Sequence, residues 1–256
     1  MLPRKVFLSA LALLLATAMV VMGAEGDRSL RAVNLEEATS SAARNLFFFG
    51  PKCPRVAPVH NFDLARYVEK SWFIQMQQVN PYQSANQLYC VAATYERDEH
   101  AAFVNVFNYG NNDRVNGAPQ TSYGNVFSRL CAKVRARDDT AELAVAPCFL
   151  RKIGVFDWLA GPYWVIAMDK VNYEWAIVSG GQPGVVKQTD PVKCTTRDDT
   201  VNGSGLWLFT RVQTGPRAEE LTRQMLAVLD SMGVFTGDLK KVVQEGCKYE
   251  GANLKL

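Results

Sequence analysis

Six cysteines and two histidines carry the side chains of this sequence that most often act as nucleophiles or metal ligands. The cysteines are Cys53, Cys90, Cys131, Cys148, Cys194 and Cys247, and the histidines are His60 and His100. No C-x-x-C pair is present, and neither histidine lies in a triad or metal-ligand pattern. An even number of cysteines is typical of a disulfide framework, although the count leaves the pairing open. We therefore expect three disulfides, no metal site, no cofactor and no catalytic residues.

The first residues have the order of a secretory signal peptide. Arg4 and Lys5 precede the apolar run VFLSALALLLATAMVVMGA, which ends in the small residues Gly23 and Ala24. This order predicts a cleaved signal over residues 1–24, an N-terminal extension over 25–52 and one domain over 53–256. The alternative is an uncleaved anchor, since the run approaches the length that spans a bilayer. With cleavage we expect no membrane span in the mature chain, although membrane contact stays open.

The rest of the chain is nearly neutral and ordinary in composition. The formal charge is +3, of which Arg4 and Lys5 contribute two positive charges, and 48% of the residues are hydrophobic. A nearly neutral domain argues against electrostatic binding of nucleic acid. This hydrophobic fraction is typical of a globular protein and too high for a disordered one.

Many short runs between turn clusters have the composition of strands. They are rich in β-branched and aromatic residues, as in QLYCVAATYE, AAFVNVFNYG, YWVIAMDK and GLWLFTRV. A series of this kind predicts an antiparallel sandwich or barrel. Strands and helices do not alternate along the sequence, which argues against a parallel sheet. One helix is expected over 216–232, where Leu221, Met225, Leu229 and Met232 fall on one face. We expect it to pack outside the β body; the alternative is a helix that binds a partner.

A long polar stretch, DPVKCTTRDDTVNGSG, separates the last two strand runs. Its composition predicts an extended loop, held by a disulfide at Cys194. Asn202 begins the sequon Asn202-Gly203-Ser204, so this residue is a candidate for N-glycosylation in an exported protein.

Three blocks along the chain form one pattern. The first block is CPRVAPVHNFDLARYVEKSWF, the second is GPYWVIAMDKVNYEWAIVSG, and the third begins with GLWLFTRV and includes the predicted helix. Together they resemble the lipocalin family, and in particular apolipoprotein D, the bacterial outer-membrane lipocalin and the chloroplastic lipocalins of plants. The matching residues are Phe62, Asp63, Tyr67, Trp72, Asp169, Tyr173, Ala176, Val178, Trp207 and Arg211. The chain departs from the pattern at Lys70, where the family has glycine, and by one additional residue before Trp72.

The resemblance implies an all-β fold, an eight-stranded antiparallel up-and-down barrel with a C-terminal helix packed outside. A barrel of eight strands has room for one small ligand or for packed side chains. By analogy with apolipoprotein D, the resemblance also implies the disulfides Cys53–Cys194 and Cys90–Cys247, which leave Cys131 to pair with Cys148.

In lipocalins the first-strand tryptophan and the last-strand arginine meet at the closed end of the barrel, so the resemblance assigns this structural role to Trp72 and Arg211. Alternation along the strands then predicts which side chains line the interior. The candidate ligand-binding residues are Ile74, Met76, Tyr173, Trp175, Ile177, Trp207 and Phe209. The alternative is that these residues are simply core.

Three functions are consistent with these features. The first is an exported protein that carries or sequesters a small hydrophobic molecule and protects lipids against oxidation. The ligand would be a lipid, fatty acid, sterol, retinoid or carotenoid-type pigment. The second is an enzyme of the lipocalin fold that acts on a lipid or xanthophyll, and the third is a structural pigment–protein subunit. We expect a monomer or a weak dimer. The expected location is extracellular, after secretion, and the alternative is the plastid or the thylakoid lumen.

Overall fold

The computed structural model describes residues 52–97, 103–121, 129–135 and 141–256. The expected signal peptide, almost all of the N-terminal extension and His100 lie outside these residues. In chain order the elements are α2 (Leu64–Glu69), β1 (Trp72–Gln78), η1 (Ala85–Gln87), β2 (Tyr89–Arg97), β3 (Phe103–Asn111), β4 (Pro119–Thr121), β5 (Leu130–Val134), β6 (Glu142–Pro147), α3 (Phe149–Lys152), α4 (Phe156–Leu159), β7 (Gly161–Met168), β8 (Trp175–Ser179), β9 (Val185–Lys187), β10 (Asp190–Thr195), β11 (Leu206–Thr210), α5 (Pro216–Ser231) and β12 (Leu239–Lys241). None of the helices described is long and apolar enough to cross a membrane.

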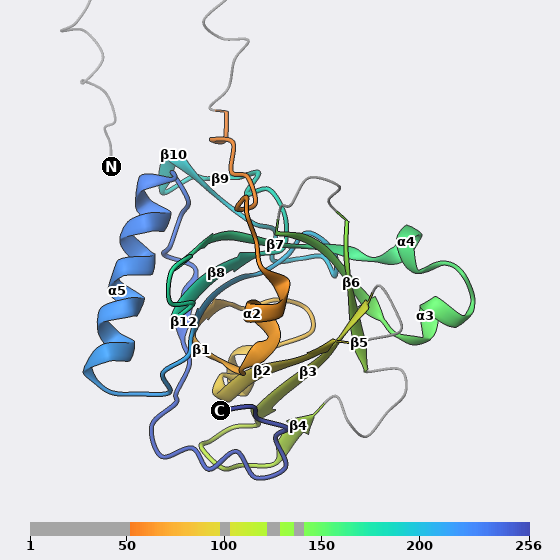
Figure 1. Cartoon of the computed structure of the whole chain (residues 1–256). Helices are drawn as coiled ribbons and strands as arrows, with labels where there is room; N and C mark the ends of the chain where they lie inside the picture. The colour runs from red at the N-terminus through yellow and green to blue at the C-terminus, as the bar shows by residue number, and fades with distance from the viewer. Residues whose placement is uncertain (1–51, 98–102, 122–128, 136–140) are drawn as a thin grey trace, which may run out of the picture. The chain divides into compact units, whose positions relative to one another are not determined.

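Eight antiparallel strands close into a barrel. Hydrogen-bonded neighbours follow the order β1, β2, β3, β5, β6, β7, β8 and β11, and β11 pairs back with β1. The short strands β4 and β12 add to β3 and β1, and β9 and β10 form a separate hairpin. Figure 1 shows α2 across the middle of this ring of strands and α5 outside it. This architecture confirms the fold that the resemblance implies.

The barrel buries apolar side chains on its inner face and, under α5, on its outer face as well. The larger interior cluster includes Trp72, Ile74, Val165 and Phe209. A second cluster joins the outer faces of β7, β8 and β11 to the apolar face of α5. Leu221, Met225 and Leu229 of α5 are almost fully buried there, which confirms that this helix packs on its own barrel.

The helix α5 begins and ends where the sequence indicates. Pro216 occupies the first turn, where a backbone N–H group would have no acceptor within the helix, so its absence in proline costs no hydrogen bond. Gly233 follows the last turn with φ of +68°, a left-handed conformation that glycine adopts without strain. The predicted range of 216–232 therefore differs from the observed helix by one residue.

The barrel has two different ends. The helix α2, the β7–β8 turn and the C-terminal residue of β11 lie at one end, which we call the closed end. The β1–β2, β3–β5, β6–β7 and β8–β11 connections lie at the other, which we call the loop end. The β6–β7 connection contains α3 and α4, and the β8–β11 connection contains the β9–β10 hairpin.

The C-terminal segment completes the wall between β1 and β2. These two strands pair only at Trp72 and Phe73, whereas β12 pairs with the second half of β1. Beyond β12, the side-chain Nε2 of Gln244 donates to the carbonyl oxygens of Ile74 and Val91, each at 2.7 Å. One amide group thus bridges the backbones of β1 and β2 where their own ladder is interrupted.

Three disulfides fasten outlying segments to the barrel. Cys53 pairs with Cys194 of β10, Cys90 of β2 pairs with Cys247, and Cys131 of β5 pairs with Cys148. These are the pairs that the resemblance implies, and no cysteine is left free. The chain-entropy account assigns each such crosslink about 2–4 kcal/mol of stabilisation.

Candidate functional site

The closed end is built around Trp72 and Arg211. The indole of Trp72 is fully buried and donates from Nε1 to the carbonyl oxygen of Tyr67 at 3.0 Å. The guanidinium carbon of Arg211 lies 3.5 Å from the centre of the Trp72 ring, within the range of a cation–π contact. These two side chains meet at the closed end, in the arrangement that the family pattern implies.

Arg211 uses its whole hydrogen-bonding capacity on the backbone. Its Nε donates to Tyr173, its Nη1 to Lys70 and Ser71, and its Nη2 to Arg66 and Tyr67, in each case to the carbonyl oxygen. A guanidinium has five N–H donors, and five carbonyl groups accept here. Burial lowers the pKa of Arg211 to about 10, so the group stays charged at neutral pH. It therefore has no free donor for a ligand.

The departure from the family pattern at Lys70 requires no glycine. Lys70 ends α2 in an extended conformation, with φ of −123°, and its carbonyl oxygen accepts from Arg211. At the start of α2, the side chain of Asp63 accepts from the backbone N–H of Arg66, a normal N-cap. The chain thus passes from α2 to β1 without a positive φ at Lys70.

Asp169 is a turn residue. Its carboxylate accepts from the backbone N–H groups of Val171, Asn172 and Glu174. Partial burial acts to raise the pKa of Asp169, but these N–H groups outweigh it and hold the pKa below its usual value. The carboxylate therefore fixes the β7–β8 turn at the closed end.

The loop end differs because several interior side chains there remain partly exposed. Seven apolar residues pack against the interior cluster without being fully buried. Two of them, Val59 and Leu64, lie just before α2 and in it, and we call the other five the loop-end group: Val79, Leu130, Val145, Tyr163 and Trp207. Each lies in the loop-end half of its strand or, for Val79, directly beyond it. Apolar side chains that pack on the interior cluster are therefore partly exposed at this end.

Trp207 lies over a glycine at the loop end. A Cβ atom added to Gly205 would come within 2.1 Å of the indole, and Gly205 has φ of +101°. Only glycine fits both the conformation and the close approach. The indole therefore extends from β11 toward the residues that precede this strand, which places it at the entrance.

Three tyrosines connect the loop-end group to the closed end. The hydroxyl of Tyr163 on β7 lies 2.7 Å from that of Tyr67 on α2 and 2.8 Å from that of Tyr95 on β2. Burial raises the pKa of Tyr67 and Tyr163 well above the usual value and that of Tyr95 to about 12. All three phenols therefore stay protonated at neutral pH. With the fully buried Gln77, which pairs with Trp207 across β1 and β11, they add polar groups to a largely apolar interior.

The structure brings together some of the predicted ligand-binding residues and separates others. Ile74, Trp207 and Phe209 belong to the barrel interior, and of these only Trp207 is partly exposed. Tyr173 also packs on the interior cluster, but at the closed end, where its hydroxyl accepts from the backbone N–H of Asp63. The role of these residues in ligand binding stays a prediction.

The orientation predicted for Met76, Trp175 and Ile177 is wrong. All three belong to the outer cluster that packs on α5. For Met76 the cause is a bulge between Ile74 and Met76, which resets the alternation of β1. For β8 the cause is that all five residues are buried, so both faces are apolar and the pattern does not identify the inner one. The inward pair is Ala176 and Val178.

Four members of the loop-end group were not predicted from the sequence. The alternation of Tyr163 and Val165 in β7 is a usable signal, since Trp164 and Ile166 pack on the outer cluster. Val145 could have been found by the same alternation in β6. Leu130 and Val79 lie at strand ends, where a pattern of period two is too short to identify a face.

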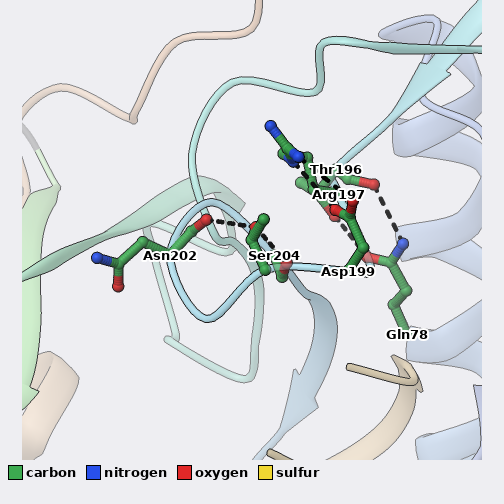
Figure 2. A network of polar contacts seen from close by, with 7 residues as sticks. Gln78, Thr196, Arg197, Asp199, Asn202 and Ser204 are labelled. Carbon is green, nitrogen blue, oxygen red and sulfur yellow. Dashed lines mark hydrogen bonds and ion pairs between the residues drawn. The ribbon is translucent and has the colours of Figure 1, made fainter. Parts of the chain in front are cut away.

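The polar stretch before β11 is more regular than the predicted loop. Its first part, Asp190–Thr195, is the strand β10 of the external hairpin. The remainder is held to the barrel by Gln78, whose amide exchanges hydrogen bonds with Thr196, and by internal contacts that include the Arg197–Asp199 ion pair (Figure 2). Asn202 of the sequon is exposed, while Ser204 is buried and its hydroxyl contacts that of Thr200. Glycosylation of Asn202 stays a prediction.

The described residues contain no cluster of three or more His, Cys, Asp or Glu side chains that could hold a metal ion. His60, the histidine within this part of the chain, is exposed and precedes the turn into α2. The arrangement that remains is a largely apolar interior, with Trp72 and Arg211 packed together at one end and the three tyrosine hydroxyls inside it.

Comparisons with known proteins concern the fold. No protein-family model and no curated protein sequence matches the chain. Among solved structures, the chain is similar to lobster apocrustacyanin A1 at 14% identity and a TM-score of 0.47, covering 77% of this chain and 96% of that one. It is also similar to insecticyanin from the tobacco hornworm Manduca sexta (15%, 0.45, 76% and 87%) and to japanin from Rhipicephalus appendiculatus bound to cholesterol (13%, 0.41, 72% and 99%). The assignment of the barrel rests on its own strand order and external helix.

Proposed function

We propose that this chain is a lipocalin that binds one small hydrophobic molecule through the loop end of its barrel. The observation that carries the proposal is the loop-end group, five apolar side chains on the interior cluster that stay partly exposed, whereas Trp72 at the closed end is fully buried. Burial of an apolar ligand against such side chains contributes roughly 25 cal/mol per Å² of surface removed from water. A concave apolar interior with a few polar groups is the usual chemistry of a small-molecule site.

Carriage or sequestration is favoured over catalysis. All six cysteines form disulfides, so the chain offers no thiol nucleophile. The charged residues of the family motif, Asp63, Asp169 and Arg211, are all bound to backbone groups at the closed end. Each therefore has a structural role that explains its presence without chemistry on a substrate.

Export is the proposed route for the protein. Three disulfides form and persist most readily in an oxidising compartment, and the expected signal peptide would take the chain there. We therefore propose a secreted protein whose mature part includes the barrel.

Tryptophan fluorescence tests the binding proposal with a matched pair of variants. Retinol and a long-chain fatty acid are titrated into the wild type, Trp207→Phe and Trp158→Phe. Trp207 belongs to the loop-end group, whereas Trp158 is 91% exposed on α4, outside the barrel. We expect saturable quenching with one ligand per chain, and we expect Trp207→Phe to lose most of the change while Trp158→Phe keeps it.

Native mass spectrometry of the protein purified from its own source provides an independent readout. An apolar molecule bound at one per chain would support the proposal. If no such molecule is recovered and neither probe quenches the fluorescence in a saturable way, the binding proposal is wrong.

A further inference from the structure

One glutamine of β1 lies inside the loop end of the barrel. Gln77 is fully buried and lies opposite Trp207 in the β1–β11 ladder. Residues directly opposite one another in an antiparallel pair point to the same face, and Trp207 packs on the interior cluster. The neighbouring pair agrees, since Met76 and Leu208 both belong to the outer cluster. The side chain of Gln77 therefore points into the barrel.

The amide of Gln77 has a partner for only one of its two polar atoms. Its Nε2 donates to Oε1 of Gln83 at 2.9 Å, whereas its Oε1 is buried and has no hydrogen-bond partner among the described residues. Gln83 fixes this orientation, because its own Nε2 donates to the carbonyl oxygen of Gln87 and its Oε1 faces Gln77. A buried carbonyl oxygen without a donor is unfavourable, and a donor brought by a ligand would stabilise it.

The next residue of the strand shows that β1 can also satisfy a buried glutamine completely. Gln78 is 2% exposed and lies on the opposite face of the wall. Its Nε2 donates to the carbonyl oxygen of Thr196, and its Oε1 accepts from the hydroxyl of the same residue (Figure 2). The amide of Gln78 thus holds the fold through both atoms. The unpaired carbonyl is the one that faces the barrel interior.

Gln77 lies beside partly exposed side chains of the loop end. Val79, which follows it on the same face, and Trp207, its neighbour across the ladder, both belong to the loop-end group. Because the Oε1 atom of Gln77 is buried in this conformation, a ligand reaches it when a covering side chain moves, and the partly exposed Trp207 is adjacent. A molecule that packs on the Trp207 indole would therefore come beside the Gln77 amide.

The surroundings select a neutral donor. No lysine, arginine, aspartate or glutamate is among the buried side chains of the described residues, and Arg211, at the opposite end, is bound to backbone carbonyls. An ammonium or carboxylate group at Gln77 would therefore be an unpaired charge, which is strongly unfavourable. A carboxylate also has no proton to donate to the Gln77 oxygen. A hydroxyl group donates a proton and carries no charge.

We propose that Oε1 of Gln77 accepts a hydrogen bond from the hydroxyl group of a neutral apolar alcohol that binds at the loop end beside Trp207. The inference rests on the proposed ligand-binding function and gives it a ligand class and an anchoring residue. It favours an alcohol over an ether or a hydrocarbon of the same shape, because these lack the donor. It also favours an alcohol over a fatty acid at neutral pH.

The test compares retinol with retinyl methyl ether, which keeps the apolar body and the oxygen but lacks the O–H donor. Quenching of tryptophan fluorescence gives both affinities for the wild type, Gln77→Met and Gln78→Met. Gln77→Met keeps an unbranched side chain of similar length and removes the amide. Gln78→Met makes the same change at the next residue, on the other face of the wall. A thermal melt of each variant verifies that the barrel is folded.

We expect the affinity for retinol, relative to that for the ether, to fall about three- to tenfold in Gln77→Met, the usual net effect of one hydrogen bond. Gln78→Met should retain the ratio of the wild type. Because each protein is compared through the ratio of its two affinities, the additional methyl group of the ether does not affect the result.

The wild type provides a second readout that does not depend on the folding of a variant. The ¹³C NMR resonance of the Gln77 side-chain carbonyl should move when retinol binds, because the oxygen gains a donor. The ether should move it less, since it brings none.

Three kinds of result would overturn the inference. If both retinoids bind but Gln77→Met keeps the wild-type ratio, Gln78→Met loses it equally, or both retinoids move the carbonyl resonance equally, Gln77 is not the anchor and the binding function stands. If the long-chain fatty acid binds and retinol does not, the ligand class is wrong and the binding function stands. If neither retinoid nor the fatty acid binds the folded wild type, the anchor is wrong, and the binding function is wrong as well when native mass spectrometry recovers no apolar molecule.

Discussion

The two ends of the barrel use similar residues for different purposes. At the closed end an indole, a guanidinium and a set of backbone carbonyls satisfy one another completely, with Trp72 fully buried. At the loop end another indole, Trp207, keeps partial exposure beside apolar neighbours. The groups at the closed end are therefore buried and paired with one another. The loop end has partly exposed apolar side chains against which a ligand could pack.

The strand β11 and the residue that follows it connect the two ends. Trp207, Phe209 and Arg211 alternate along this segment and point to the same side of the wall. The first is partly exposed, the second is buried, and the third is bound to five carbonyl groups. Within five residues, the side chains on this inward face thus change from partly exposed at the loop end to buried and hydrogen-bonded at the closed end. This comparison predicts that substitutions along it shift from affecting binding to affecting stability.

The largest expected effect is at the closed end. Trp72→Ala should lower the free energy of unfolding by about 3–5 kcal/mol, because it leaves a large cavity and removes the partner of Arg211. Urea unfolding followed by circular dichroism measures the change. Trp158→Ala is the matched control, since that side chain is 91% exposed and its removal should alter stability by less than about 0.5 kcal/mol. Similar losses in both variants would contradict the contrast.

The buried tyrosines should make the barrel sensitive to alkali. Burial raises the pKa of Tyr95 from the usual value of 10.0 to about 12. A pKa that is raised in the folded state stabilises the protein fully below the unfolded value, and this stabilisation is lost as the pH rises through the folded value. Tyr95 alone should cost about 2–3 kcal/mol between pH 10 and pH 12, and Tyr67 and Tyr163 act in the same direction.

Urea unfolding at a series of pH values measures this effect, with Tyr95→Phe as the comparison. The phenylalanine variant cannot ionise at this position, so its stability should fall less steeply between pH 10 and pH 12. Parallel curves for the two proteins would show that Tyr95 ionises in the barrel as easily as in the unfolded chain.

The fold could be predicted from the sequence more completely than the site. Trp72, Arg211 and the helix at 216–231 carry strong local signals, since they depend on residue type and on spacing within one element. The inward faces depend on more. A bulge in β1 reverses the assignment of Met76, and a helix packed outside makes β8 apolar on both faces. Period-two alternation contains neither piece of information.

The cluster of tyrosines illustrates the same limit over longer distances. Tyr67, Tyr95 and Tyr163 come from α2, β2 and β7, and only closure of the barrel brings their hydroxyls within hydrogen-bonding distance. Each is unremarkable in its local sequence, because an aromatic residue in a strand or beside one is common. Sites assembled from distant strands require the strand order and the register.

The loop end should respond to substitution through binding. Trp207→Ala should weaken an apolar ligand by about tenfold, since it removes the largest apolar surface of the loop-end group. Phe209→Ala lies one step deeper on the same face and should cost mainly stability, about 3 kcal/mol or more. Displacement of a fluorescent probe and urea unfolding, measured on both variants, separate the two effects. An unchanged affinity in Trp207→Ala would show that this residue is not part of the ligand-binding site.

The smallest expected effect on binding is at Met76, on the outer face of the same wall. Its side chain is partly buried against α5, so Met76→Ala should cost about 1 kcal/mol of stability and leave the affinity for an apolar ligand unchanged. Ile74→Ala is the matched inward control on the same strand, two residues before Met76. The bulge between these two residues decides which side chain points inward. A loss of affinity in Met76→Ala would therefore show that the inner face of β1 is wrongly assigned and that Met76 points into the barrel.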